Sequence, residues 1–328
     1  MGTKNANLHS AKRAKNDEFY TQLTDIEKEV VHYKDHFKDK IVLCNCNDAL
    51  HTNFAKYFSL NFEWLGLKQL ICTSFGENAK AYIYNGDKNG NHIPDLEEWD
   101  QIELKENGDF RSGEMIELLK KADIVCTNPP FSQFREYVAQ LVEYDKEFLI
   151  IGNMNAITYK EIFPLITENK MWLGYKNINT DMAFKVPQDS EEKSVRFWVD
   201  ENGEKWRSIG NGCWFTNLDH QKRHQPLDLY KHYNEEEYPK YDNYNAINVD
   251  KVTDIPLDYD GVMGVPITFL DKYCPTQFQI VGFWNAGIAG ENLGASYCEA
   301  ISKGNTITWN GPTVKKQTKY FRVLIKKL

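Results

Sequence analysis

The tetrapeptide Asn128-Pro129-Pro130-Phe131 holds residue types that can activate a weakly nucleophilic amino group. An exocyclic amino group on a nucleobase attacks poorly because its lone pair is conjugated with the ring. The side-chain carbonyl of Asn128 and the backbone carbonyl of Pro129 are acceptors for its two hydrogens, and Phe131 offers a face for stacking. The pattern predicts a site that aims a planar amino group at an electrophile by positioning and preorganised dipoles, without a strong base.

This tetrapeptide follows a predicted buried strand at 123–127 and precedes a predicted helix at 133–144. It therefore lies at the carboxyl edge of a sheet, where α/β proteins bind ligands. A base inside a duplex cannot reach such a pocket, so a nucleobase substrate must be flipped out. A rigid Pro-Pro turn that only connects a strand to a helix is the structural alternative.

Strands and helices alternate over residues 22–175, which predicts an α/β fold with a parallel sheet and helices on both faces. Residues 76–107 are rich in Gly, Asn, Asp and Glu and are expected to form a long loop or insertion. The predicted strands of this half lie at 41–45, 68–74, 123–127, 146–152 and 171–174.

The pattern changes after residue 194. The segments 195–199 and 205–209 flank Glu201-Asn202-Gly203, and Asn-Gly between two such segments predicts a β-hairpin. Further strands are expected at 212–218, 261–270, 278–284, 306–309 and 320–326.

Three other segments lie where a cofactor would bind such a sheet, namely 17–21, 44–48 and 108–112. Asp48 and Asp109 can accept hydrogen bonds from an amino group, and Phe110 can flank an aromatic ring, although a loop aspartate is more often a turn or cap residue. The glycine-rich phosphate fingerprint and the P-loop lysine motif are both absent from the sequence, which disfavours a dinucleotide dehydrogenase or an NTPase.

From about Lys15 to its end the sequence resembles the EcoRI-type DNA adenine-N6 methyltransferases, the modification half of restriction–modification pairs. The segments 123–131, 148–153 and 238–244 are very close to the family pattern, whereas 76–107, 176–194 and 285–312 depart from it. The serine form of the tetrapeptide is commoner in cytosine-N4 enzymes, so Asn128 favours adenine.

The resemblance implies a Rossmann-like α/β methyltransferase sheet with helices on both faces, a mixed C-terminal DNA-recognition region, and S-adenosylmethionine as cofactor. It places a catalytic domain at 16–218, with a hairpin insertion at about 194–210, and target recognition in 219–328. The composition of residues 1–15 predicts a flexible basic arm. The flipped adenine would be held by Asn128, Pro129, Pro130 and Phe131. The cofactor would contact Phe19, Tyr20, Thr21, Asn45, Cys46, Asp48, Asp109 and Phe110.

Sequence reading in the DNA grooves needs Arg, Lys and Asn side chains, because Arg pairs with guanine and Asn with adenine. For any single candidate, the alternative is a charge on a solvated surface. The candidates for DNA binding are Arg196, Lys205, Arg207, Lys222, Arg223, Asn243 and Asn245.

The formal net charge of -8 argues against nucleic acid only if charge is evenly spread. Residues 1–15 carry four basic residues and 311–328 carry six, with no acid in either segment, so the middle of the chain carries a net -18. Seven cysteines without a C-x-x-C pair or a zinc spacing predict no disulfide framework and no metal site. Without an apolar membrane-length run or signal sequence, we expect a cytoplasmic protein that does not bind membranes.

The resemblance further implies a monomer that acts on double-stranded DNA, with a restriction endonuclease as genetic partner and no stable complex between them. Two alternatives stay open from the residues. The same chemistry fits methylation of RNA or of a protein glutamine amide, and the fold is compatible with a DNA-binding relative that has lost catalysis.

Overall fold

The computed structural model describes residues 20–45, 50, 52–176, 178, 182–186, 188, 196–208, 210–242, 244–284, 313–314, 317–318 and 321–328. The basic arm predicted at 1–15 and the strand predicted at 306–309 lie outside these residues. The chain divides into two compact units. The first comprises residues 1–157 and 173–219, and the second comprises 158–172 and 220–328.

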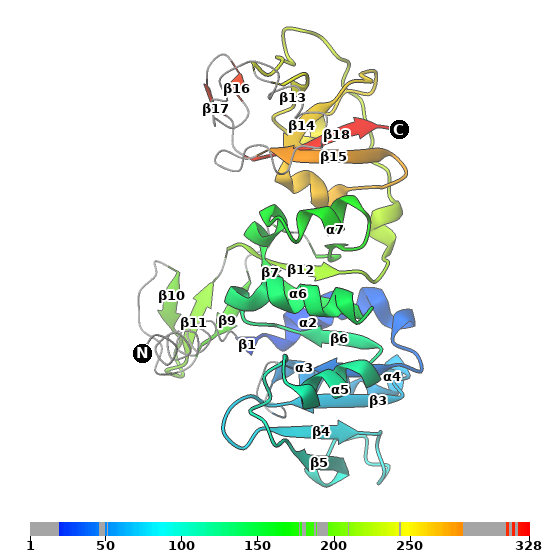
Figure 1. Cartoon of the computed structure of the whole chain (residues 1–328), viewed down its shortest axis with the longest axis vertical. Helices are drawn as coiled ribbons and strands as arrows, with labels where there is room; N and C mark the ends of the chain where they lie inside the picture. The colour runs from blue at the N-terminus through cyan, green and yellow to red at the C-terminus, as the bar shows by residue number, and fades with distance from the viewer. Residues whose placement is uncertain are drawn as a thin grey trace. The chain divides into compact units, whose positions relative to one another are not determined.

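Four apolar segments form the parallel centre of an eight-stranded sheet in the first unit (Figure 1). The chain passes from β2 to β3 on one side and then returns to β6 on the other side of β2, so the strand order reverses between β2 and β6. The sheet order is β5-β4-β3-β2-β6-β7-β12-β8, with bounds β2 Ile41–Cys44, β3 Gln69–Thr73, β4 Lys80–Tyr84, β5 Trp99–Glu103, β6 Ile124–Thr127, β7 Glu147–Asn153, β8 Trp172–Leu173 and β12 Gly212–Thr216.

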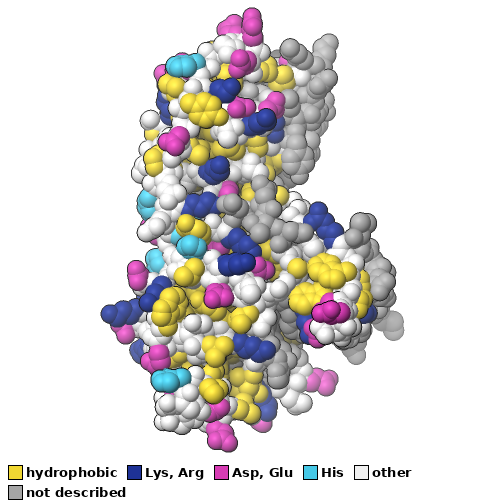
Figure 2. Space-filling model, turned by 180° about the vertical axis from the view of Figure 1, so that it is seen from behind, with side chains coloured by type: hydrophobic (Ala, Val, Ile, Leu, Met, Phe, Trp, Pro, Cys, Tyr) yellow, Lys and Arg dark blue, Asp and Glu magenta, His cyan; other side chains and the backbone are white. Residues whose placement is uncertain are grey.

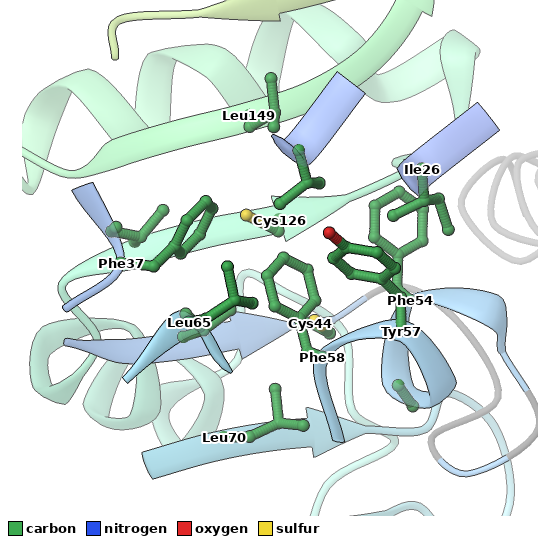
Figure 3. Close-up of a cluster of buried hydrophobic side chains, with 14 of the residues drawn as sticks. Ile26, Phe37, Cys44, Phe54, Tyr57, Phe58, Leu65, Leu70, Cys126 and Leu149 are labelled. Atoms are coloured by element: carbon green, nitrogen blue, oxygen red, sulfur yellow. The ribbon is translucent and has the colours of Figure 1, made fainter. Parts of the chain in front are cut away.

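Helices cover both faces of this sheet. Successive strand residues point to opposite faces, so neighbouring residues of β7 contact different helices. Leu149 and Ile151 of β7 belong to a core cluster with residues of α2, α3 and α4. Figure 3 shows part of such a cluster, with Leu149 of β7 and Ile26 of α2 labelled. Gly152 instead lies against Phe134 of α6. The predicted α/β fold with helices on both faces is confirmed. The helices are α2 Leu23–Val30, α3 Asn53–Leu60, α4 Phe62–Leu65, α5 Gly113–Lys121 and α6 Phe134–Glu143, with short 3-10 helices at Val31–His36, Leu96–Glu98, Phe131–Gln133 and Met154–Thr158.

The prediction of a loop over residues 76–107 is wrong, because this segment contributes two antiparallel strands, β4 and β5, to the sheet edge. The sequence Lys80–Tyr84 has the β-branched and aromatic residues of a strand. The Asn, Asp and Gly residues that dominate the composition instead form the connection between the strands, where Asp87 accepts hydrogen bonds from the backbone N–H of Asn89, Gly90 and His92.

A second, smaller sheet of the first unit has the order β1-β9-β11-β10. The hairpin predicted around Asn202-Gly203 is confirmed, since β10 and β11 pair antiparallel. Gly203 takes a positive φ of 75°, and the Asp200 carboxylate accepts hydrogen bonds from the backbone N–H of Asn202 and of Glu204. The bounds are β1 Tyr20–Thr21, β9 Ala183–Lys185, β10 Phe197–Val199 and β11 Lys205–Ser208.

The second unit has its own sheet, of order β13-β14-β18-β15, which confirms a separate C-terminal region. A buried arginine, Arg322, donates hydrogen bonds to Asn248 at 3.2 Å and to Asp250 at 3.1 Å within this unit. The strand predicted at 261–270 ends at Pro266 and continues as a 3-10 helix. The elements are α7 Phe163–Thr167, β13 Ile247–Asn248, β14 Met263–Pro266, β15 Phe278–Trp284, β16 Thr313–Val314, β17 Gln317–Thr318 and β18 Arg322–Lys327, with 3-10 helices at Gln221–His224, Val252–Asp254 and Ile267–Lys272.

Within the described ranges, no helix has the length and apolarity needed to cross a membrane. The same residues contain no group of three or more His, Cys, Asp or Glu side chains arranged to hold a metal ion.

Candidate active site

The carboxyl ends of β2 and β6 are tied together where the strand order reverses. The Thr127 hydroxyl at the end of β6 donates a hydrogen bond to the backbone carbonyl of Asn45, which follows β2. The side-chain carbonyl of Asn45 accepts a hydrogen bond from the Tyr137 hydroxyl on α6. Asn45 is only 3% exposed. Its two oxygens accept hydrogen bonds from protein hydroxyls, as buried polar groups require.

The tetrapeptide directly continues β6 at this edge. Asn128 is 6% exposed, and its side-chain Nδ2 donates to the Thr21 hydroxyl at 3.3 Å. The backbone carbonyl of Pro130 accepts from the Gln133 N–H at 2.9 Å, which starts the 3-10 turn that leads into α6. Phe131 is partly buried against the core cluster. The structure therefore brings Asn128 to the edge that the sequence predicted for it.

The loop at 107–110 lies against the end of β3. Gly108 has a φ of 73°, and a Cβ at this position would lie 2.1 Å from the backbone oxygen of Ser74, so no side chain fits there. Phe110, 5% exposed, packs edge-on against Tyr137 with ring centroids 5.1 Å apart. Tyr137 thus contacts both Phe110 and Asn45, two residues predicted to hold the cofactor.

The carboxylate of Asp109 is held by Arg111. Arg111 donates from Nε to Oδ1 at 2.8 Å and from an Nη to Oδ2 at 2.7 Å, while its other Nη donates to Glu136 at 3.0 Å. These bonds lower the pKa of Asp109, so the side chain is a carboxylate, and thus an acceptor only, at neutral pH.

Comparison with known proteins settles the family. The family model "Adenine-specific methyltransferase EcoRI" matches residues 7–328. The chain belongs to this family. The type II methyltransferase M.EcoRI of Escherichia coli is 47% identical over 331 residues, which cover 97% of this chain and 95% of that protein. No solved structure matches the chain.

Two mycoplasma proteins support the same assignment. A type II methyltransferase of Mycoplasma genitalium is 39% identical and covers 98% of each chain. Another, of Mycoplasma pneumoniae, is 43% identical and covers 84% of each chain. The resemblance inferred from the motifs is confirmed, and the protein is an adenine-specific methyltransferase.

In this EcoRI-type methyltransferase, Cys44 and Cys126 near the site are not nucleophiles. Cys44 of β2, Cys72 of β3 and Cys126 of β6 are all buried, and Cys44 is aligned with Cys72 in the parallel pairing. Burial raises the pKa of Cys44 and of Cys126 well above the usual range for a thiol. The thiols of Cys44 and Cys126 therefore stay protonated and act as small apolar groups in the core.

Not every predicted cofactor residue can be placed. Thr21, Asn45, Asp109 and Phe110 lie at or next to the carboxyl edge, and Tyr20 begins β1. Phe19, Cys46 and Asp48 lie outside the described residues.

Two residues at this edge escaped the sequence analysis. Tyr137 links Asn45 to Phe110, and its only sequence signal was its position on the buried side of helix 133–144, between Phe134 and Val138. Thr73 ends β3, is 1% exposed, and its hydroxyl has no hydrogen-bond partner among the described residues. A single threonine at a strand end carries no signal that distinguishes it from a core residue.

The predicted DNA-binding residues are spread over both units. In the first unit, Lys205 and Arg207 belong to β11, and Arg196 directly precedes β10. In the second unit, Lys222 forms an ion pair of 2.8 Å with Asp271, and Arg223 lies 3.4 Å over the Trp172 ring. Asn245 is exposed, while Asn243 lies outside the described residues.

Proposed function

We propose that this enzyme transfers a methyl group from S-adenosylmethionine to N6 of an adenine flipped out of duplex DNA at a specific sequence. The observation that carries the proposal is the buried Asn128 at the carboxyl edge where the strand order reverses, beside Asn45. The relatives named as type II methyltransferases support a DNA substrate and a place in a restriction–modification pair.

The residues at the edge fit a nucleoside-bearing cofactor. The buried Thr73 hydroxyl at the end of β3 offers a hydrogen-bonding group that the described protein does not use. Phe110 supplies an aromatic contact and Asp109 a carboxylate acceptor in the adjacent loop. When bound, S-adenosylmethionine supplies an electrophilic methyl group. Thr21 and Asn45 complete the proposed cofactor set with Tyr20 and with Phe19, Cys46 and Asp48.

The target adenine would be held by Asn128, Pro129, Pro130 and Phe131. The Asn128 side-chain carbonyl and the Pro129 backbone carbonyl accept the two N6 hydrogens, so the nitrogen lone pair turns out of the ring plane. Phe131 stacks on the ring, and Pro130 stiffens the turn. These neutral acceptors are fixed before the substrate arrives, so they need no reorganisation during the reaction.

DNA contacts are proposed for Arg196, Lys205, Arg207, Lys222, Arg223, Asn243 and Asn245, with 219–328 as the target-recognition region. On the face shown in Figure 2, acidic and basic side chains are interspersed among the described residues. Such a surface disfavours binding of DNA by a broad basic face and favours local contacts. We propose that the enzyme works as a monomer, without a stable complex with its endonuclease.

The test is methyl transfer from labelled S-adenosylmethionine to duplex DNA, RNA and protein in parallel. The wild type should label only DNA, at N6 of adenine. Asn128→Ala should lose at least about 100-fold in turnover, because it removes a preorganised acceptor. Near-wild-type turnover by Asn128→Ala would refute the mechanism. Labelling of RNA or protein instead of DNA would favour the alternative substrates.

A matched control is Asn217→Ala. Asn217 accepts a hydrogen bond from the Phe148 N–H at 2.8 Å and donates to the Lys146 carbonyl at 2.9 Å, near the start of β7. Asn217→Ala therefore removes a partly buried asparagine from the edge where β7 begins, opposite the carboxyl edge that holds Asn128. This variant should lose stability and keep its turnover per folded molecule.

A further inference from the structure

Thr21 is fixed at the carboxyl edge by contacts on three sides. Its backbone pairs with Phe184 in the antiparallel ladder between β1 and β9. Its carbonyl accepts a hydrogen bond of 2.8 Å from the Asn53 side chain at the start of α3. Its hydroxyl accepts a hydrogen bond of 3.3 Å from Asn128 Nδ2. The backbone that carries this hydroxyl is therefore held by contacts that do not involve Asn128.

The orientation of the Asn128 carboxamide matters for the proposed reaction. Its two ends, an oxygen that only accepts and an NH2 that only donates, exchange positions on a half-turn about the terminal bond. Only the oxygen can accept a hydrogen from an amino group of the substrate. If the NH2 faced the substrate, two donors would oppose each other, and the amino group would lose one of its acceptors.

We propose that Thr21 is a positioning residue that holds the Asn128 carboxamide with Oδ1 toward the target amino group, an inference that rests on the proposed function. The Thr21 hydroxyl serves as the acceptor for Nδ2 in the productive orientation. Because a hydroxyl can also donate, the bound amino group completes the choice of orientation, since only Oδ1 can accept its hydrogen. Thr21 is 4% exposed and Asn128 6%, so water does not readily replace that acceptor. This role is additional to the contact with the cofactor that is proposed for Thr21.

The central test compares Thr21→Val, which keeps the side-chain shape without the hydroxyl, with Thr21→Ser, which keeps the hydroxyl. The readouts are the single-turnover rate of methyl transfer at saturating S-adenosylmethionine and duplex, and the Kd of each ligand. Thr21→Val should lower the rate by about 10- to 100-fold through misplacement of the acceptor. The Kd of the duplex should change by no more than about twofold, since the lost interaction acts on the transition state. Saturation removes any effect of a changed Kd for S-adenosylmethionine from the measured rate. Thr21→Ser should retain most of the rate.

A matched control removes another buried hydroxyl of the same unit. Thr216 on β12 is fully buried and donates to the Phe148 carbonyl at 2.6 Å. Thr216→Val should lower the unfolding temperature and leave the rate unchanged. The positioning role is overturned if Thr216→Val slows transfer as much as Thr21→Val, or if Thr21→Ser is as slow as Thr21→Val. It is equally overturned if Thr21→Val only weakens cofactor binding and reaches the wild-type rate at saturation.

A second readout does not depend on activity. In protein labelled with 15N-asparagine, the Asn128 side-chain NH2 signals are assigned by their loss in Asn128→Asp. These signals should shift and exchange faster with water in Thr21→Val and stay near the wild-type positions in Thr21→Ser. Unchanged signals in Thr21→Val would overturn the positioning role. A wild type that methylates no DNA would refute the proposed function instead. The amide signals would then test only whether the Asn128 NH2 binds the Thr21 hydroxyl.

Discussion

The hydroxyl of Tyr137 offers a sharp test of how the candidate site is held together. It donates to the side-chain carbonyl of Asn45, which is 3% exposed. Tyr137→Phe keeps the ring that packs against Phe110 and removes only this donor. Leaving a buried carbonyl without its partner costs about 1–3 kcal/mol. For a unit of this size, a loss of about 2 kcal/mol lowers the unfolding temperature by about 4–8 °C.

Thermal unfolding followed by circular dichroism measures this change, and calorimetry measures the Kd of S-adenosylmethionine. We expect weaker cofactor binding, because Asn45 belongs to the proposed cofactor site. Tyr230→Phe is the control, since Tyr230 is 63% exposed and its hydroxyl is available to water. It should change neither quantity.

A double-mutant cycle with Asn45→Leu isolates the pair. In the Asn45→Leu background, the Tyr137 hydroxyl faces an apolar group, so removing it should cost little or restore some stability. The reasoning is refuted if Tyr137→Phe unfolds at the wild-type temperature, or if it costs the same free energy in both backgrounds.

Three further predictions concern the surrounding fold. Gly152→Ala places a Cβ 2.5 Å from Phe134 and 2.9 Å from Phe215, so chemical denaturation should show a loss of about 1–3 kcal/mol; Gly113→Ala, with nothing within 4 Å, should be neutral or stabilising. In the wild type, the Lys176 N–H donates to the Glu29 carboxylate at 2.8 Å. Glu29→Gln puts an NH2 opposite this N–H and should lower the free energy of unfolding by about 2 kcal/mol. Glu27→Gln, at an exposed position, should leave the free energy of unfolding unchanged. The pairing with Arg111 lowers the pKa of Asp109. This pairing stabilises the fold above the ordinary aspartate pKa of about 4, and the stabilisation is lost as the pH falls through the pKa of the folded state. The urea midpoints of wild type and Asp109→Asn should therefore differ at pH 7 and converge below about pH 4.

The elements that position the site were predictable because their signals are local. Each parallel strand is a short apolar run. The hairpin is marked by Asn202-Gly203, where Gly203 takes a positive φ. The strands β4 and β5 were missed because composition was averaged over 76–107, where the polar connection outweighs the strand at Lys80–Tyr84. A shorter window would have separated the strand from the connection.

The contacts inside the site could not be predicted in the same way. The bond between Asn128 and Thr21 joins residues 107 positions apart, and the bond between Tyr137 and Asn45 joins residues 92 positions apart. Each depends on where the parallel pairing brings two strand ends together, and on which side chain of a neighbouring element reaches the edge. The motif thus indicated the place of the chemistry, whereas the partners that orient it required the three-dimensional structure.

The polar groups around Asn45 and Asn128 share one physical property that suits methyl transfer. Hydroxyls of Thr127, Tyr137 and Thr21 bind the two asparagines, Asn45 and Asn128, and the neighbouring thiols are held neutral by burial. Transfer of a methyl group from a sulfonium to a neutral amino group moves a positive charge without creating one. A fixed anion beside the sulfonium would stabilise the charge most strongly before transfer and so oppose its movement. Oriented neutral dipoles, such as amides held by hydroxyls, avoid this cost, so the net charge of the chain says little about this chemistry.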